Sequence, residues 1–206
     1  RLMAERGAAV TLAGIPAAGI DAVAAEIGAA GGRCLAVTTD VRVESDLETV
    51  IQQTVESFGK LNVVVANAGV QRHNTDVDLH RMDEAEWELT QDVNLRGVVR
   101  TCKLGLAQMV EQASGGTIVI VSSITGLNGR TPNVSYMTAK TGLLGLNRHI
   151  AVHYARHGIR AAAIRHRQLE GEVTPLGHHA DGTQKLVAMV ERACFVPAPF
   201  PGHYEP

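Results

Sequence analysis

Five short apolar runs, most of them rich in β-branched residues, recur along the chain, and segments long enough for helices separate them. Runs of this length and composition are typical of buried strands. Strands that alternate with helices of ten or more residues form right-handed βαβ units around a parallel sheet. The pattern therefore predicts an α/β fold, a doubly wound parallel sheet with helices on both faces. The expected strands are residues 10–13, 34–38, 63–66, 118–121 and 160–164.

Glycines and capping residues indicate where the helices begin and end. Gly7 is expected to end a helix over residues 2–6, and the pair Gly31-Gly32 to end an alanine-rich helix. Ser45-Asp46-Leu47-Glu48 has the spacing of a capping box, which predicts a helix from there to about residue 58. Two longer helices are expected over residues 83–112 and from Tyr136 to about residue 157. No repeat, low-complexity tract or linker divides the chain, so we expect one domain over residues 1–206, with an atypical C-terminal segment over 166–206.

The fourth strand leads to the residues with the clearest chemistry. It ends in Ser122 and Ser123, and the helix that follows carries Tyr136 and Lys140. Residues four apart lie on one face of a helix, so the phenol and the ammonium can meet. A nearby cation favours the phenolate and is expected to lower the pKa of the tyrosine, and a serine hydroxyl can hold a reacting oxygen. The alternative is a surface tyrosine beside a solvated lysine.

Two further motifs precede this pair in the chain. Asn67-Ala68-Gly69 follows the third strand, and Asn94 lies in the sequence DVNLRG within the long helical region. In isolation the first could be an ordinary turn, and the second a helix asparagine that bonds its own backbone. In this order, the four motifs resemble those of the short-chain dehydrogenase/reductases over residues 2–164. The catalytic serine of that family lies thirteen residues before the tyrosine, which selects Ser123 over Ser122.

The resemblance implies a Rossmann-like fold and an NAD(P)-dependent oxidoreductase that acts on a small secondary alcohol or ketone. Tyr136 would be the general acid for carbonyl reduction and the general base for alcohol oxidation. Lys140 would lower the pKa of Tyr136 and hold the nicotinamide ribose. Ser123 would orient the substrate oxygen, and Asn94 would position a water in the proton path. These four residues are the expected catalytic tetrad.

The resemblance also assigns the cofactor site. Where the family reads the ribose, this chain has Gly14 and Ile15, neither an acid for NAD nor an arginine for the 2′-phosphate of NADP. NAD is slightly favoured over NADP, because these positions carry no cation that could bind the 2′-phosphate of NADP. Thr174 follows the family's continuation only in the short match Glu172-Val173-Thr174-Pro175. The expected cofactor-binding residues are Asp40, Val41, Asn67, Ala68, Gly69, Tyr136, Lys140 and Thr174.

The chain departs from the family pattern at both ends. The family's first strand and its glycine-rich phosphate loop are not found before residue 10, and His166-Arg167 stands where the family has Pro-Gly. We therefore expect a chain truncated at its N-terminus. Its strands should either separate into a group of two and a group of three, or residues 10–13 should pair directly with residues 63–66. Such a chain is expected to bind NAD(H) or NADP(H) poorly. The alternative function is a catalytically impaired fragment that acts only as a structural or subunit-interaction module.

Composition and charge narrow the partners. The net charge of -2 gives no electrostatic reason to expect a nucleic acid or an anionic membrane, and no apolar run is long enough to span a membrane. Three widely spaced cysteines suit free thiols in a reducing cytoplasm. His149, His153 and His157 have a spacing that could hold zinc, but no acidic or cysteine ligand accompanies them, so no metal is expected. The resemblance, and apolar residues on the two long helices around Val98 and Leu144, predict a homodimer or homotetramer.

Overall fold

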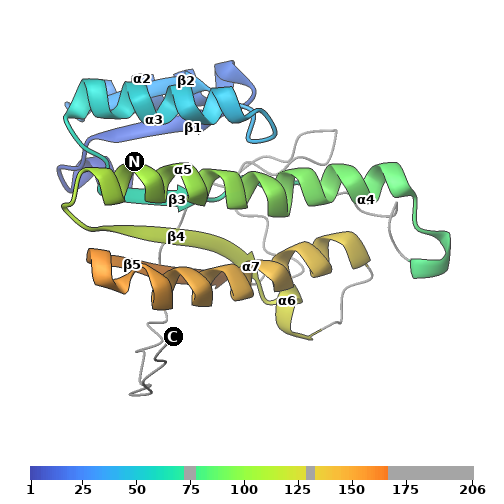
Figure 1. Cartoon of the computed structure of the whole chain (residues 1–206). Helices are drawn as coiled ribbons and strands as arrows, with labels where there is room; N and C mark the ends of the chain where they lie inside the picture. Colours follow the sequence, from blue (N-terminus) through green and yellow to red (C-terminus); the bar gives the residue numbers. More distant parts are fainter. Residues whose placement is uncertain (72–77, 129–132, 167–206) are drawn as a thin grey trace.

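The computed structural model describes residues 1–71, 78–128 and 133–166, and it has the layered α/β arrangement that the sequence predicts (Figure 1). All five expected strands form, and the third and second have the predicted bounds. Every strand pair is parallel. The strands are β1 (Val10–Gly14), β2 (Cys34–Thr38), β3 (Val63–Ala66), β4 (Gly116–Ser123) and β5 (Ile159–His166).

These strands form two separate sheets. One has the order β1-β2 and the other the order β3-β4-β5, so the expected division into two strands and three is confirmed. Within the described residues, neither β1 nor β3 has a second strand partner, and Val63 on β3 is 40% exposed although it is a strand valine. The middle strand of the larger sheet is β4, where Ile118 and Ile120 are fully buried.

Helices pack against both sheets, and most of them match the predicted segments. Gly7, with a φ of 88°, ends the first helix as expected. The long region from residue 83 to residue 112 is helical, but its middle six residues are a π-helix, and Asn94 lies within it. The helical segments are α1 (Leu2–Glu5), α2 (Ala17–Ala29), α3 (Glu44–Phe58), η1 (Leu79–Arg81), α4 (Glu84–Gln91), η2 (Asp92–Gly97), α5 (Val98–Glu111), α6 (Thr125–Asn128), α7 (Val134–His153) and η3 (Ala155–His157).

Two expectations about helix ends are wrong. The capping box is not formed, because α3 starts at Glu44 and its cap residue, Val43, provides no side-chain hydrogen bond. Asp46 instead accepts a hydrogen bond of 2.9 Å from the backbone N–H of Asp40, which ties the loop after β2 to the first turn of α3. The helix that carries Tyr136 ends at His153 rather than at residue 157, and a short 3₁₀ turn follows it.

The main core lies between the larger sheet and helices α5 and α7. Helix α5 lies close to the sheet because Gly105 faces Val64, where a Cβ would lie 2.7 Å from the valine Cγ2. Val98 is 1% exposed and belongs to this core, so its own side chain is not on the surface of the chain. The expected assembly through the helices around Val98 and Leu144 stays a prediction. Its neighbour Val99 is 39% exposed. The fully or nearly fully buried members of the core include Val98, Cys102, Met109, Ile118, Ile120, Leu143, Ile150 and Ile159.

Helix α3 connects the smaller sheet to the rest of the domain. Thr54 on α3 donates a hydrogen bond of 2.8 Å to the hydroxyl of Thr11 on β1. At the other end of the helix, Glu44 forms an exposed ion pair of 2.7 Å with Lys103 on α5. Among the described residues, no helix has the length and hydropathy that a membrane span requires.

Candidate functional site

The two serines at the end of β4 have different surroundings. Ser122 donates a hydrogen bond of 2.8 Å to the backbone carbonyl of Lys140 on α7. Ser123 forms a side-chain hydrogen bond with Tyr136, and its Oγ also accepts the backbone N–H of Thr125 at 3.2 Å. Both serines are buried. Ser123 is therefore the serine that contacts the tyrosine, as the spacing of thirteen residues predicts.

Tyr136 and Lys140 lie one turn apart on α7 and both are buried, at 7% and 3% exposure. The ammonium nitrogen of Lys140 lies 5.5 Å from the centre of the Tyr136 ring. It donates a hydrogen bond of 2.8 Å to the backbone carbonyl of Val121, two residues before Ser123 on β4. The alternative of a surface tyrosine beside a solvated lysine does not agree with this burial.

Burial shifts the pKa values of both groups. It lowers the pKa of Lys140 from 10.5 to about 8, because the ammonium loses water and gains only a neutral carbonyl in exchange. Burial likewise raises the pKa of Tyr136 above its ordinary value, while the hydrogen bond from Ser123 acts in the opposite direction. The expectation that the neighbouring lysine gives Tyr136 a lowered pKa is wrong here, since the cost of burying the phenolate exceeds the favourable contacts.

Asn94 joins the π-helix to the loop after β3. Its side chain is fully buried, and its amide group exchanges two hydrogen bonds with the backbone of Val70, at 3.1 and 2.8 Å. The same amide nitrogen also donates to the carbonyl of Thr90 at 3.1 Å. Both amide hydrogens and one oxygen lone pair are therefore engaged, which leaves one side-chain lone pair for a water. The structure gives Asn94 a bracing role, and its predicted role with a water stays a prediction.

Gly69 lies where the loop after β3 comes closest to these residues. A Cβ at this position would lie 2.7 Å from Asn94 Oδ1 and 3.6 Å from Lys140 Nζ. A larger residue would push the loop away from the amide that holds it, so the close approach requires glycine. Asn67 and Ala68 occupy the two positions between β3 and this glycine, half-buried at the carboxyl end of the strand.

The residues expected at the adenine end lie after β2. Asp40 accepts hydrogen bonds from the backbone and the Nε of Arg42, at 2.9 and 3.0 Å, and this guanidinium lowers the pKa of the carboxyl. Val41 packs against the π-helix, where a Cβ on Gly97 would lie 2.7 Å from the valine Cγ2. The loop is thus fixed close to the segment that carries Asn94. Thr174 lies outside the described residues.

Three site residues were not identified from the sequence. Gln91, at the end of α4, donates a hydrogen bond of 2.9 Å to the carbonyl of Ser135, and the carbonyl of Val121 receives the lysine ammonium. Gly126 faces α7, where a Cβ would lie 3.0 Å from the carbonyl carbon of Lys140. Only Gly126 had a sequence signal, because a glycine just after a strand-ending serine is consistent with a close backbone approach.

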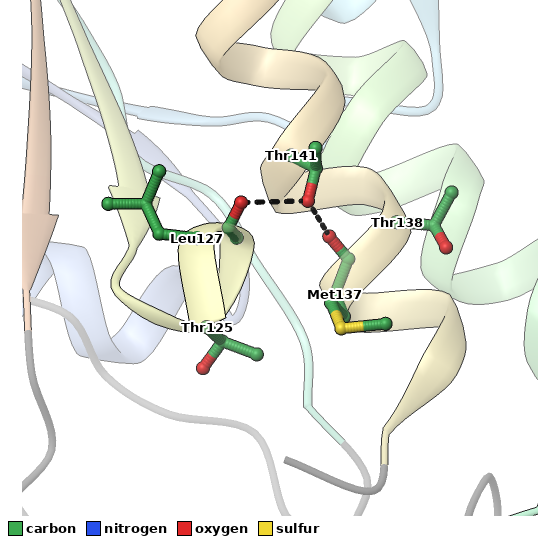
Figure 2. Close-up of a pocket in the computed structure, with 6 residues that line it drawn as sticks. Thr125, Leu127, Met137, Thr138 and Thr141 are labelled. Carbon is green, nitrogen blue, oxygen red and sulfur yellow. Dashed lines mark hydrogen bonds between the residues drawn. The ribbon is translucent and has the colours of Figure 1, made fainter. Parts of the chain in front are cut away.

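A pocket of about 320 Å³ lies beside this contact, between α6 and α7 (Figure 2). The hydroxyl of Thr141 on α7 shares its one hydrogen between the carbonyl of Gly126 on α6 and that of Met137, at 3.0 and 2.8 Å. Leu127, on α6, is 56% exposed. The lining is a mixture of hydroxyls and apolar side chains, from Thr125, Gly126, Leu127, Met137, Thr138 and Thr141.

The histidine row on α7 does not assemble a metal site in the part of the chain that the structure describes. The rings of His149 and His153 lie 4.4 Å apart, and that of His157 lies near Tyr154 instead. Within residues 1–71, 78–128 and 133–166, no three potential ligands of the histidine, cysteine or acidic type come together.

Comparison with known proteins is consistent with this geometry. Residues 1–174 match the short chain dehydrogenase family. The chain is 42% identical over 164 residues to cis-4-hydroxycyclohexanecarboxylate dehydrogenase of Sinomonas cyclohexanicum, which covers 80% of the chain and 64% of that protein. It is 35% identical over 136 residues to an uncharacterized NAD-dependent oxidoreductase of Mycobacterium tuberculosis, covering 66% of the chain and 48% of that protein.

A solved structure of a reductase is also similar to this chain. Levodione reductase superposes with a TM-score of 0.73 at 32% identity, over 80% of this chain and 63% of that one. The chain thus spans less than two thirds of the length of each of these three proteins.

The buried lysine predicts a specific pH dependence of stability. Between about pH 8 and the unfolded-state pKa of 10.5, the unfolded chain binds more protons at Lys140 than the folded chain does. The free energy of unfolding should therefore rise with pH from about 8 towards 10, by at most about 1.4 kcal/mol per pH unit. Urea unfolding from pH 7.5 to 9.5 measures this rise, which should be absent in Lys140→Met.

The control is Lys103→Met, which removes a lysine that is 65% exposed on α5 and should keep the wild-type rise. Parallel pH profiles for the wild type and Lys140→Met would contradict the assignment of the shift to Lys140.

Proposed function

Because the chain belongs to the short-chain dehydrogenase/reductase family, a family of oxidoreductases, we propose that its protein is an NAD(P)-dependent enzyme acting on the CH–OH group of a small secondary alcohol or on the corresponding ketone. The observation that carries the proposal is the buried contact of Ser123, Tyr136 and Lys140 at the carboxyl end of β4. Ligands of doubly wound parallel sheets bind at this end of the strands.

In this proposal the protein residues move the proton and hold the substrate, while a bound nicotinamide supplies or accepts the hydride. Ser123 orients the substrate oxygen, and Tyr136 gives that oxygen a proton during carbonyl reduction or removes one during alcohol oxidation. The raised pKa of Tyr136 keeps the phenol protonated at neutral pH, which is the form that reduction requires. Lys140 favours the phenolate only when it is charged, which its pKa of about 8 makes sensitive to pH.

The described residues fit the two ends of a dinucleotide, the nicotinamide ribose and the adenine. Gly69 lets the loop after β3 pack closely against Asn94 and Lys140, because a Cβ there would lie 2.7 Å from Asn94 Oδ1. In the proposal Lys140, beside this loop, holds the nicotinamide ribose. The loop at Asp40 and Val41 would receive the adenine. Between these ends, β1 and β3 each have one edge that no strand of the described part of the chain pairs with. We propose that a further strand of the intact protein, with a glycine-rich turn, pairs with both edges and holds the pyrophosphate.

For the cofactor we favour NAD. Gly14 ends β1 and Ile15 follows it, where the family reads the ribose, and Ile15 is 58% exposed, so no cation at these positions attracts a 2′-phosphate. The M. tuberculosis relative, whose printed name calls it NAD-dependent, supports the same preference.

For the substrate we propose a ring alcohol or ring ketone. The 42% identical relative is named for a hydroxycyclohexane carboxylate, so this compound and unsubstituted cyclohexanol are the first substrates to test.

The split sheet favours one alternative function. If the chain acts without the additional strand, it would be a catalytically impaired structural or subunit-interaction module, because the phosphates would have no cradle. Absence of turnover in a form of the protein that contains the strand and the glycine-rich turn would support this alternative.

We also propose that the protein forms a homodimer or homotetramer through α5 and α7. Val99 on α5 and Val152 on α7 are 39% and 70% exposed, which is high for valines on long helices. Light scattering at micromolar concentration should give at least twice the monomer mass, and a Val152→Glu variant should reduce that mass. A monomer for the wild type would contradict the proposal.

The central test of the proposed function is Tyr136→Phe. Removing the phenolic hydroxyl removes the proton-transfer group, so kcat should fall by about 10² to 10⁴. Binding of NADH, followed by its fluorescence, should be retained because the ring remains. The matched control is Tyr154→Phe, which changes a tyrosine just after α7 and should leave kcat unchanged. A Tyr136→Phe variant with kcat within about tenfold of the wild type would contradict the role of Tyr136.

A further inference from the structure

Gln91 is a buried amide between two elements of the site. It is the last residue of α4, it is 6% exposed, and its Nε2 donates a hydrogen bond of 2.9 Å to the backbone carbonyl of Ser135. Ser135 is 2% exposed and immediately precedes Tyr136 in the first turn of α7. A side-chain hydrogen bond therefore joins the end of α4 to the residue beside the tyrosine.

The helix does not need this hydrogen bond to satisfy its backbone. Ser135 lies at the second position of a 20-residue helix, where its carbonyl also faces the N–H four residues ahead. The carbonyls that lack helical partners are those of the last turn, at the other end of α7. The amide of Gln91 thus adds a contact that fixes where the first turn of α7 lies, rather than filling a vacancy in it.

A second buried hydrogen bond reaches α7 from the sheet. Ser122 donates to the carbonyl of Lys140 at 2.8 Å, one turn after Tyr136. The backbone of α7 is therefore anchored on both sides of the tyrosine, to α4 through Gln91 and to β4 through Ser122. Gln91 also directly follows Thr90, whose carbonyl accepts the amide of Asn94. Adjacent residues of α4 thus contact the elements that carry Asn94 and Tyr136.

We propose that Gln91 is a positioning residue, which holds the first turn of α7 so that the hydroxyl of Tyr136 meets Ser123. The catalytic part of this role rests on the proposed function, but the positioning itself is a property of the folded chain. Without the amide, the first turn of α7 can shift relative to β4, and the hydrogen bond between Tyr136 and Ser123 lengthens. Gln91 would contact no reacting atom.

The positioning can be measured without substrate or cofactor. Tyrosine labelled with ¹³C at Cζ gives an NMR signal that responds to the hydrogen bond of the phenol, and loss of one signal in Tyr136→Phe identifies the signal of Tyr136. Ser123→Ala gives the shift that follows loss of the hydrogen bond. Gln91→Met should move the Tyr136 signal in the same direction as Ser123→Ala does. Gln91→Glu, which keeps the size but lacks the donor, should do the same and serves if Gln91→Met does not fold.

The chain offers a matched control in Gln112→Met. Gln112, just after α5, also donates its side-chain amide to a backbone carbonyl, that of Leu61, at 2.6 Å. Its substitution removes the same kind of hydrogen bond at the C-terminal end of α5, whereas Gln91 lies before the N-terminal end of that helix. It should leave the Tyr136 signal in place. A folded Gln91 variant whose Tyr136 signal stays at the wild-type position would overturn the proposal.

Activity provides a separate measurement. In a protein that turns over, Gln91→Met should lower kcat by about 10- to 100-fold with KM within about twofold, because a displaced proton donor affects the chemical step more than substrate binding. A protein without oxidoreductase activity would leave the NMR result intact, so failure of the proposed function and failure of the positioning role are distinguishable. An unchanged kcat beside a shifted Tyr136 signal would overturn the catalytic part of the proposal.

Discussion

The burial of the Lys140 ammonium against the carbonyl of Val121 is the constraint on which the rest of the site depends. A buried cation is costly unless it is paired and hydrogen-bonded. Lys140, at 3% exposure, offsets part of that cost with its hydrogen bond to β4, and the loop at Gly69 lies beside it. Its lowered pKa measures the remaining cost, and the raised pKa of Tyr136 has the same origin. The site therefore combines two desolvated groups, and burial favours the neutral form of each.

Several residues that are distant in the sequence hold the elements around Lys140 and Tyr136 in place. Asn94 braces the loop that brings Gly69 to the lysine, and it does so from a π-helix, a form of helix that is often found at functional sites. Gln91 and Ser122 hold the backbone of α7 at Ser135 and at Lys140, before and after Tyr136. These contacts lie in the larger, three-stranded sheet and the helices packed on it. The smaller sheet, which is joined to them mainly through α3, would contribute only the adenine end of a cofactor site.

Features that depend on local sequence pattern could be predicted from the sequence. Features that depend on burial or on packing between distant segments could not. Strand positions and the Tyr136–Lys140 pairing follow from periodicity, so both were predicted. The direction of the Tyr136 pKa shift was not, because a four-residue spacing indicates the cation but not the desolvation that exceeds its effect. The capping box failed because α3 begins at Glu44, so that Ser45 lies inside the helix and not at its cap. The burial of Val98 in the core was not predicted, because an apolar helix residue does not by itself show which face of the helix is covered. Gln91 had no signal, because its partner is a backbone carbonyl 44 residues away.

The central claim is that this buried constellation supports hydride transfer between a nicotinamide and a carbinol carbon. The most direct measurement is the reduction of a ring ketone with NADH that carries deuterium at both C4 positions of the nicotinamide, using a form of the protein that contains the phosphate-binding strand. The account predicts one deuterium on the carbinol carbon of the product and none on its oxygen in light water. A product that carries only solvent hydrogen on that carbon, or no reduction of any ring ketone with either NADH or NADPH, would contradict it.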